Sequence, residues 1–152
     1  MRRMLVVCLL GIASLLARAA SNCHAVGGTV STNFVNATTT TGTATGDLAG
    51  SIGVTVLSVT PGPNGTVVFH NQHTWVTSSG DTIYAQAADV TAFPTPVTNF
   101  YAANYLNGVK IAGGTGRFAK ATGKISSWGA VNLNLGEVSL RYEGTVCYGN
   151  GN

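Results

Sequence analysis

Apolar and polar residues alternate along most of the chain after the first twenty positions, in short runs that are rich in Val, Thr and Ala. Alternation with a period of two is the pattern of a strand with one buried face, and β-branched residues favour strands. The runs predict strands at residues 26–36, 39–47, 51–60, 65–77, 81–91, 103–113, 121–133 and 137–148. Helix-forming Glu, Lys, Gln and Leu are scarce, so the pattern predicts an all-β protein.

Turn residues separate the predicted strands. Gly, Pro, Asn and Asp gather at residues 61–65, 78–81, 113–116 and 135–136, and the prolines of 93–97 predict a longer loop. Eight short antiparallel strands in one domain predict a closed barrel or a sandwich. In the last strand, alternation places Val138, Leu140, Tyr142, Gly144 and Val146 on one face.

The first twenty residues differ from the rest. They begin with two arginines near the N-terminus, followed by a short apolar run and a small-residue end, which is the layout of a secretory signal cleaved after Ala19 or Ala20. We therefore expect one domain over residues 21–152 in a secreted protein, whether extracellular, periplasmic or apoplastic. Asn36-Ala-Thr38 and Asn64-Gly-Thr66 would accept N-glycans only in a eukaryotic cell.

Removing the signal changes the charge balance. Three of the eight basic residues lie within it, which leaves five basic against five acidic side chains. A net charge of zero argues against a nucleic-acid partner, and against a membrane partner after cleavage. No cofactor or metal motif accompanies this composition.

Two cysteines remain in the mature chain, Cys23 and Cys147. In an oxidising compartment such a pair most simply forms a disulfide, although free thiols and metal ligation are alternatives. A disulfide from Cys23 to the last predicted strand would join the first and last strands, as a closed barrel requires.

The segment Ile111–Gly123, IAGGTGRFAKATG, contains the pattern G-x-G-x-x-A. A dinucleotide fingerprint requires a long helix after the glycines, but strand character returns from Lys124 onward. A P-loop would require a terminal Gly-Lys-Ser/Thr, which is absent. The motif therefore predicts a tight reversal between two strands, built by Gly113, Gly114, Gly116, Phe118 and Gly123.

The same segment resembles the GGTG-[KR]-F-x-x-A-x-G signature of dirigent proteins and the related signature of allene oxide cyclases. Weaker similarities follow in the same order along residues 25–148: at 45–56, at 75–84 and at 141–148. The acidic and arginine pocket residues of the plant families have no match here, and the compact chain is more similar to secreted bacterial relatives.

The resemblance implies a calycin-like, eight-stranded antiparallel barrel with an apolar cavity, often assembled as a homotrimer. It implies a small hydrophobic or phenolic ligand, whose cyclisation or coupling the cavity would guide. Whether a reaction is catalysed stays open, and no catalytic residue is assigned. The alternative is a non-enzymatic extracellular structural or surface protein, whose barrel would be filled with side chains.

Candidate cavity residues are aromatic and histidine side chains within predicted strands. His70 and His73 lie three apart on one strand, so they point to opposite faces and do not form a metal pair. His73 shares its face with Phe69, Asn71 and Trp75, and could act as a donor or general base if that face points inward. The residues expected to line the cavity are Phe69, His73, Trp75, Tyr84, Tyr105 and Tyr142.

Overall fold

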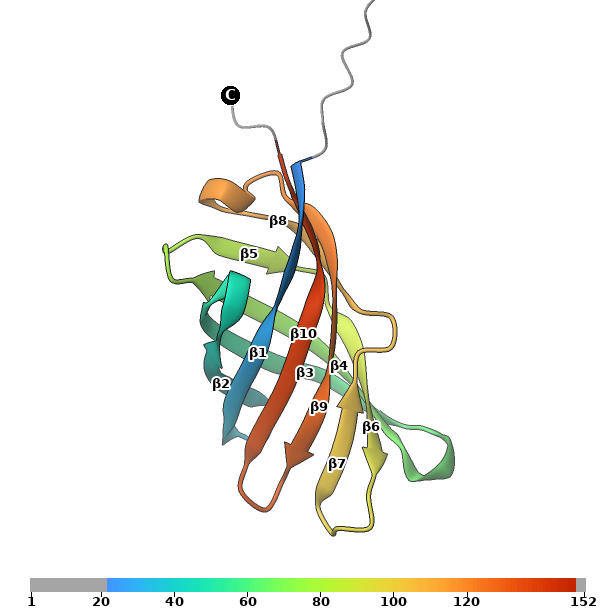
Figure 1. Cartoon of the computed structure of the whole chain (residues 1–152). Coiled ribbons are helices and arrows are strands. Elements are labelled where there is room, and N and C mark those ends of the chain that lie inside the picture. Colours follow the sequence, from blue (N-terminus) through green and yellow to red (C-terminus); the bar gives the residue numbers. More distant parts are fainter. Residues whose placement is uncertain (1–21, 150–152) are drawn as a thin grey trace, which may run out of the picture.

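A computed structural model describes residues 22–149, which form a closed, eight-stranded antiparallel β-barrel (Figure 1). The predicted signal segment lies outside the described residues. The strands are β1 (Asn22–Asn36), β2 (Thr39–Ala44), β3 (Gly50–Pro61), β4 (Val67–Thr77), β5 (Thr82–Ala85), β6 (Ala88–Pro94), β7 (Phe100–Asn104), β8 (Val109–Gly114), β9 (Thr122–Asn132) and β10 (Glu137–Tyr148). Short 3₁₀ helices are η1 (Gly46–Leu48), η2 (Pro63–Gly65) and η3 (Gly116–Phe118). No helix of the described part is long and apolar enough to cross a membrane.

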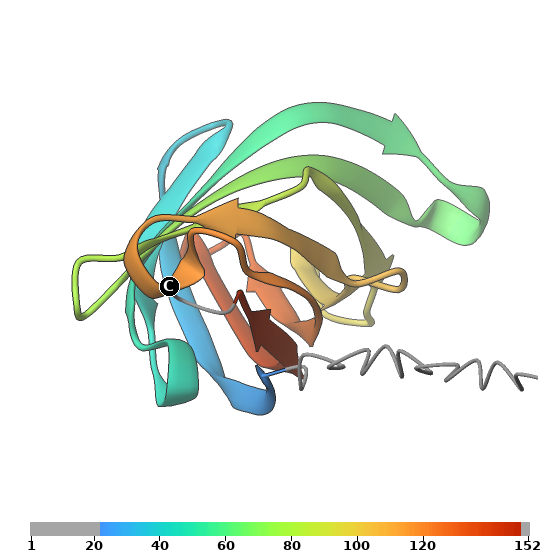
Figure 2. The same cartoon turned by 90° about the horizontal axis from the view of Figure 1, so that it is seen from above.

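The barrel closes between the first and last strands. Strand β1 pairs with β10 from Asn22↔Tyr148 to Asn33↔Glu137, and its other edge pairs with β2. Seen from above, the strands wrap into a ring, and the β3–β4 hairpin with η2 projects away from it (Figure 2). Closure leaves no long unpaired edge along β1 or β10, which protects the sheet from pairing with other chains.

Two of the eight strands that form the barrel wall are each interrupted and appear as two shorter strands, which corrects the prediction of continuous strands at 81–91 and 103–113. Strands β5 and β6 both pair with β4, while β7 and β8 both pair with β9. The second break is a turn in which the Gly108 amide donates to the Tyr105 carbonyl at 2.8 Å, with Gly108 at φ +64°. At the first break, Gln72 and His73 of β4 have no ladder partner in β5 or β6, and the Gln72 side-chain amide donates to the Ala85 carbonyl at 3.0 Å.

The upper half of the barrel in Figure 1, where β1 begins and β10 ends, holds the larger cluster of buried hydrophobic side chains. Leu48 of η1 and Phe118 of η3 are both fully buried there. The Trp75 indole donates to the Leu48 carbonyl at 2.8 Å, and the Tyr142 hydroxyl donates to the Thr45 carbonyl at 2.7 Å. Loop residues therefore plug this end, and two buried aromatic residues hold the η1 plug in place.

The motif Ile111–Gly123 forms the end of β8, the η3 turn and the start of β9. Gly113 has φ +119° and Gly116 has φ +50°, conformations that favour glycine. Gly114 lies against Thr82, so that any larger side chain would collide with the Thr82 backbone carbonyl. The prediction of a strand reversal anchored by Phe118 is confirmed.

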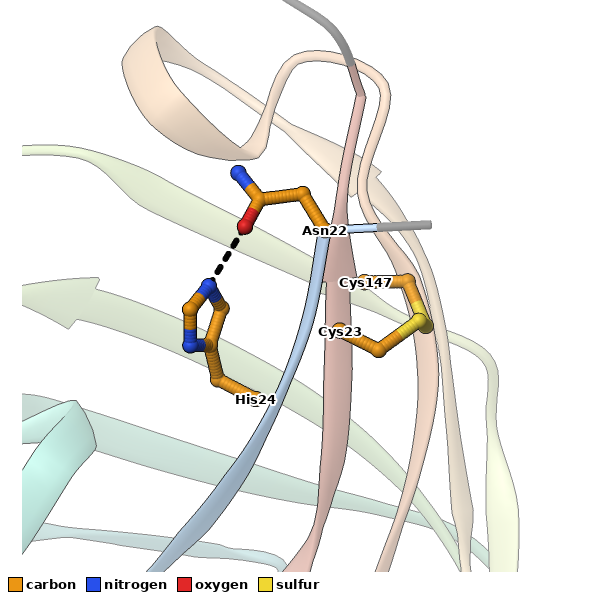
Figure 3. The surroundings of a disulfide bond; sticks show 4 residues. All are labelled: Asn22, Cys23, His24 and Cys147. Carbon is orange, nitrogen blue, oxygen red and sulfur yellow. Dashed lines mark hydrogen bonds between the residues drawn. A yellow bond between two sulfur atoms is a disulfide. The ribbon is translucent and has the colours of Figure 1, made fainter. Parts of the chain in front are cut away.

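Cys23 and Cys147 form a disulfide, as expected from the sequence. The two cysteines are directly paired residues of β1 and β10, and the bond closes a loop with a sequence separation of 124 (Figure 3). Neither the free thiols nor the metal ligation considered above applies to this pair. The bond is consistent with an oxidising environment.

Candidate functional site

The lower half of the barrel is hollow. It holds a cavity of about 330 Å³, within the range of roughly 300–1,000 Å³ that is usual for small-molecule sites. No residue that lines this cavity is charged or is a histidine. The lining consists of Phe34, Ala37, Thr38, Thr40, Val54, Val56, Val59, Val67, Phe69, Asn71, Val90, Ala92, Tyr101, Ala103, Tyr105, Val131, Leu133, Val138 and Leu140.

Strand alternation explains how these side chains come to face inward. Every second residue of β4, β6, β7 and β10 contributes to the lining in the lower half. Strand β3 departs from this rule, because Val56 and Val59 both line the cavity although they are three residues apart. A β-bulge accounts for it: the register shifts between Val56 and Ser58, leaving Leu57 as the extra, exposed residue.

A cluster of buried polar side chains lies between the hollow and filled halves. It consists of Asn71, His73 and Tyr105, each no more than 8% exposed. Asn71 Nδ2 donates to Tyr105 Oη at 3.0 Å, and His73 Nε2 lies 2.9 Å from the same oxygen. Tyr105 lines both the main cavity and a second cavity of about 40 Å³ on its upper side, which His73 also lines.

The break between β7 and β8 places Tyr105 in the cluster. Its amide donates to the Ser127 carbonyl of β9 at 2.9 Å, and the turn to Gly108 follows directly. Asn71 and His73 come from alternate positions of β4, so both side chains point to the interior. Strands β4 and β9 and the turn after β7, which are remote in sequence, therefore position one hydroxyl group at the inner end of the cavity.

Burial keeps this cluster uncharged. It lowers the pKa of His73 from 6.5 to about 4, because desolvation disfavours the imidazolium. Burial also raises the pKa of the Tyr105 phenol to about 12, against a smaller lowering by the hydrogen bond from Asn71. At neutral pH His73 is a weak base and Tyr105 a weak acid, so the cluster is better suited to hydrogen bonding than to proton transfer.

Two atoms of the cluster lack hydrogen-bond partners among the described residues, Asn71 Oδ1 and His73 Nδ1. Buried polar atoms are nearly always paired, so unpaired ones in a native interior call for a physical explanation. The polar cluster borders an apolar cavity, and this arrangement is typical of a binding site in which a few polar groups orient an otherwise apolar ligand.

The six residues expected to line a cavity have separate locations. Phe69 and Tyr105 line the main cavity, and His73 lies behind Tyr105 at the small one. Trp75 and Tyr142 belong to the filled upper half, where their rings meet edge to face with centroids 5.3 Å apart. These two side chains touch only the small cavity and serve chiefly to hold η1 in place.

Tyr84 does not line either cavity, contrary to the expectation from the sequence. It is 54% exposed, whereas its neighbour Ile83 on β5 is 1% exposed and points inward. Because successive residues of a strand face opposite sides, the inward position of Ile83 turns Tyr84 toward solvent.

His70 and His73 lie on opposite faces of β4, as the three-residue spacing predicts. His70 is on the outer face, and its Nδ1 lies 2.7 Å from Asp89 Oδ1. Within residues 22–149, no group of three or more His, Cys, Asp or Glu side chains is placed to hold a metal ion. None of the five carboxylates in this part of the chain is buried, so no acid is available inside the barrel.

Asn71 is the site residue that the sequence did not single out. The alternation of β4 did place it on the face of Phe69 and His73, and an amide on an otherwise apolar inward face is a signal for a buried polar contact. Its partner Tyr105 lies 34 residues away, and sequence periodicity carries no information about that contact.

No known protein family, curated protein or solved structure matches this chain. The resemblance of Ile111–Gly123 to dirigent proteins and allene oxide cyclases therefore stays a prediction from the motif residues. The cavity and its polar inner end carry the functional interpretation.

Proposed function

We propose that this protein is a secreted barrel that binds a small hydrophobic or phenolic molecule in its lower cavity. The observation that carries the proposal is the contrast between the two halves. The upper half is plugged by Leu48 and Phe118, while the lower half encloses about 330 Å³ behind an uncharged, mainly apolar lining. Removing apolar surface from water is favourable by about 25 cal/mol per Å², so an apolar ligand gains binding free energy when it enters the cavity.

Holding the ligand fits the chemistry of the cluster better than acid–base catalysis does. His73 has a lowered pKa and no carboxylate is buried, so no strong acid or base faces the cavity. Guiding a reactive intermediate toward cyclisation or coupling would require only a fixed orientation of that intermediate. The similarity of the Gly113–Gly123 segment to dirigent proteins supports this guiding role as an extension of binding.

The proposal of secretion rests on two features. The Cys23–Cys147 disulfide suits an oxidising compartment, and residues 1–20 have the composition of a cleaved signal. Sequencing the N-terminus of the mature protein tests this part, since cleavage after Ala19 or Ala20 would leave a chain that begins at Ala20 or Ser21.

A pair of neighbouring alanines on β7 allows a matched test of binding. Ala103 lines the cavity and is 3% exposed, whereas Ala102 faces outward. The neutral fluorophore N-phenylnaphthylamine should bind the wild-type protein and Ala102→Phe with the same affinity. In Ala103→Phe the added ring occupies the cavity, so binding should be lost while the fold, followed by circular dichroism, is kept.

Other outcomes would favour the structural alternative. If the probe does not bind the wild-type protein, the cavity does not take apolar molecules, and an extracellular structural role becomes the better explanation. If Ala103→Phe and Ala102→Phe weaken binding equally, the probe binds elsewhere on the barrel.

A further inference from the structure

We infer that the inner end of the cavity selects ligands whose polar group is an uncharged oxygen, a hydroxyl or a carbonyl, and rejects ionised carboxylates. The ligand enters with this oxygen first, so that it reaches Tyr105, while its apolar body fills the space toward the lower turns. This inference rests on the proposed function and specifies the chemical class of ligand for the same cavity.

The position of the polar groups sets the orientation. Asn71 and Tyr105 lie at the inner end, where the main cavity meets the small cavity. Nearer the β1–β2 turn, Thr38 Oγ1 donates its hydrogen to Asn36 Oδ1, and Thr40 Oγ1 accepts a hydrogen bond from Thr32 Oγ1. A ligand oxygen therefore finds an unused hydrogen-bonding group at the inner end.

The hydrogen bonds of Tyr105 leave room for one more partner. A phenolic oxygen has one hydrogen to donate and accepts two hydrogen bonds. Asn71 Nδ2 occupies one accepting position, and His73 Nε2 uses either the second accepting position or the hydrogen. In either case Tyr105 Oη can form one further hydrogen bond.

The tautomer of His73 decides whether Tyr105 Oη donates or accepts this further hydrogen bond. If His73 carries its proton on Nε2, it donates to Tyr105, and the Tyr105 hydrogen is free for a ligand carbonyl or hydroxyl oxygen. If the proton is on Nδ1, Nε2 accepts the Tyr105 hydrogen, and Oη can accept from a ligand hydroxyl. Tyr105 Oη can therefore adapt to a ligand donor or a ligand acceptor, and Asn71 Oδ1, which lacks a partner among the described residues, can accept a hydrogen bond but cannot donate one.

Electrostatics exclude an ionised ligand head. None of the cavity lining residues is cationic, and burial keeps His73 neutral at neutral pH. A buried carboxylate is stable only when it is paired with a cation or receives several hydrogen bonds. The inner end offers few hydrogen-bond donors and no cation, so a carboxylate would lose more hydration than it regains.

Three probes with one apolar body test the inference by isothermal titration at about pH 8: para-pentylphenol, para-pentyltoluene and para-pentylbenzoate. One net hydrogen bond is worth about 1 kcal/mol, so the phenol should bind about fivefold more tightly than the hydrocarbon. The benzoate should bind at least tenfold more weakly than the phenol.

Two tyrosines of the lining provide a variant and its control. Tyr105→Phe should abolish the preference for the phenol over the hydrocarbon and leave hydrocarbon affinity unchanged, whereas Tyr101→Phe should keep the preference. Because Tyr105→Phe leaves Asn71 Nδ2 and His73 Nε2 without their partner, the double variant Asn71→Leu/Tyr105→Phe serves as a second test that removes one of these two buried polar side chains. It should show the same loss of preference.

The outcomes separate this inference from the proposed function. If none of the three probes binds, the proposed function itself is overturned. If the hydrocarbon binds but the benzoate binds as tightly as the phenol, or Tyr105→Phe keeps the preference for the phenol, binding stands and the selection for an uncharged oxygen is wrong.

Discussion

The buried imidazole of His73 should make the protein less stable as the pH falls below neutral. In the folded state its pKa is about 4, against 6.5 for an exposed histidine, because burial disfavours the charged form. Well above pH 6.5 the imidazole is neutral in both states and has no effect on the pH dependence. As the pH falls through this value, His73 binds a proton in the unfolded chain but not in the folded protein, so the free energy of unfolding falls.

The size of this effect follows from the two pKa values. A difference of one in pKa corresponds to about 1.36 kcal/mol, so the full loss is about 3 kcal/mol, of which about 2.5 kcal/mol is reached by pH 4.5. This is a large part of the roughly 5–15 kcal/mol by which domains are usually stable. It should be visible in an ordinary unfolding experiment.

Urea unfolding of the wild-type protein and His73→Gln, each at about pH 7.5 and pH 4.5, isolates the contribution of His73. All other ionisable groups are the same in the two proteins, so their effects cancel when the two pH differences are compared. We expect the wild-type protein to lose about 2.5 kcal/mol more than His73→Gln. Equal losses in the two proteins would refute the lowered pKa and the assignment of a neutral cluster to the barrel interior.

Further predictions concern the closure and the filled half. The double variant Cys23→Ser/Cys147→Ser should stay folded but lose up to about 5 kcal/mol of unfolding free energy in urea, because the disulfide spans 124 residues; unchanged stability would show that the β1–β10 pairing alone suffices. Phe118→Ala should lower the unfolding free energy by about 3–5 kcal/mol, since the ring is fully buried, and a loss below about 1 kcal/mol would mean that η3 does not plug the barrel. Gly114→Ala should lower the free energy of unfolding, measured by thermal unfolding, by at least about 1–3 kcal/mol, because the added methyl group collides with the Thr82 backbone. Gly53→Ala should differ little from the wild-type protein, because no atom lies closer than 3.8 Å to the added methyl group.

The alternation of residues predicted most of the barrel, because side-chain direction in a strand is a local property. The inward face of β10, with Leu140 and Val146, follows from it directly. The interruption of two strands of the wall does not follow from it. One interruption, at Gln86–Ala87, lies where the partner of β4 changes from β5 to β6, and the other, at Tyr105–Gly108, lies where the partner of β9 changes from β7 to β8. Such a break depends on contacts between segments that are distant in sequence.

The candidate site was harder to predict for a related reason. Alternation shows which residues face inward, but it does not show how much of the interior they fill. The upper half is full because Leu48 and Phe118 enter it from loops, whereas the lower half has small residues such as Ala92 and Ala103 and no plug. Asn71 becomes a site residue only through its contact with Tyr105, which the fold creates.

The central claim is that the lower cavity takes a small apolar molecule, and a methyl NMR titration with para-pentylphenol tests it most directly. We expect saturable shifts at methyl groups around the cavity, in Val90, Val131 and Leu140, with those of Ile83 and Ile125 in the filled half almost unchanged. The absence of saturable shifts at the cavity, or shifts confined to exposed residues such as Leu57 and Leu106, would contradict the claim.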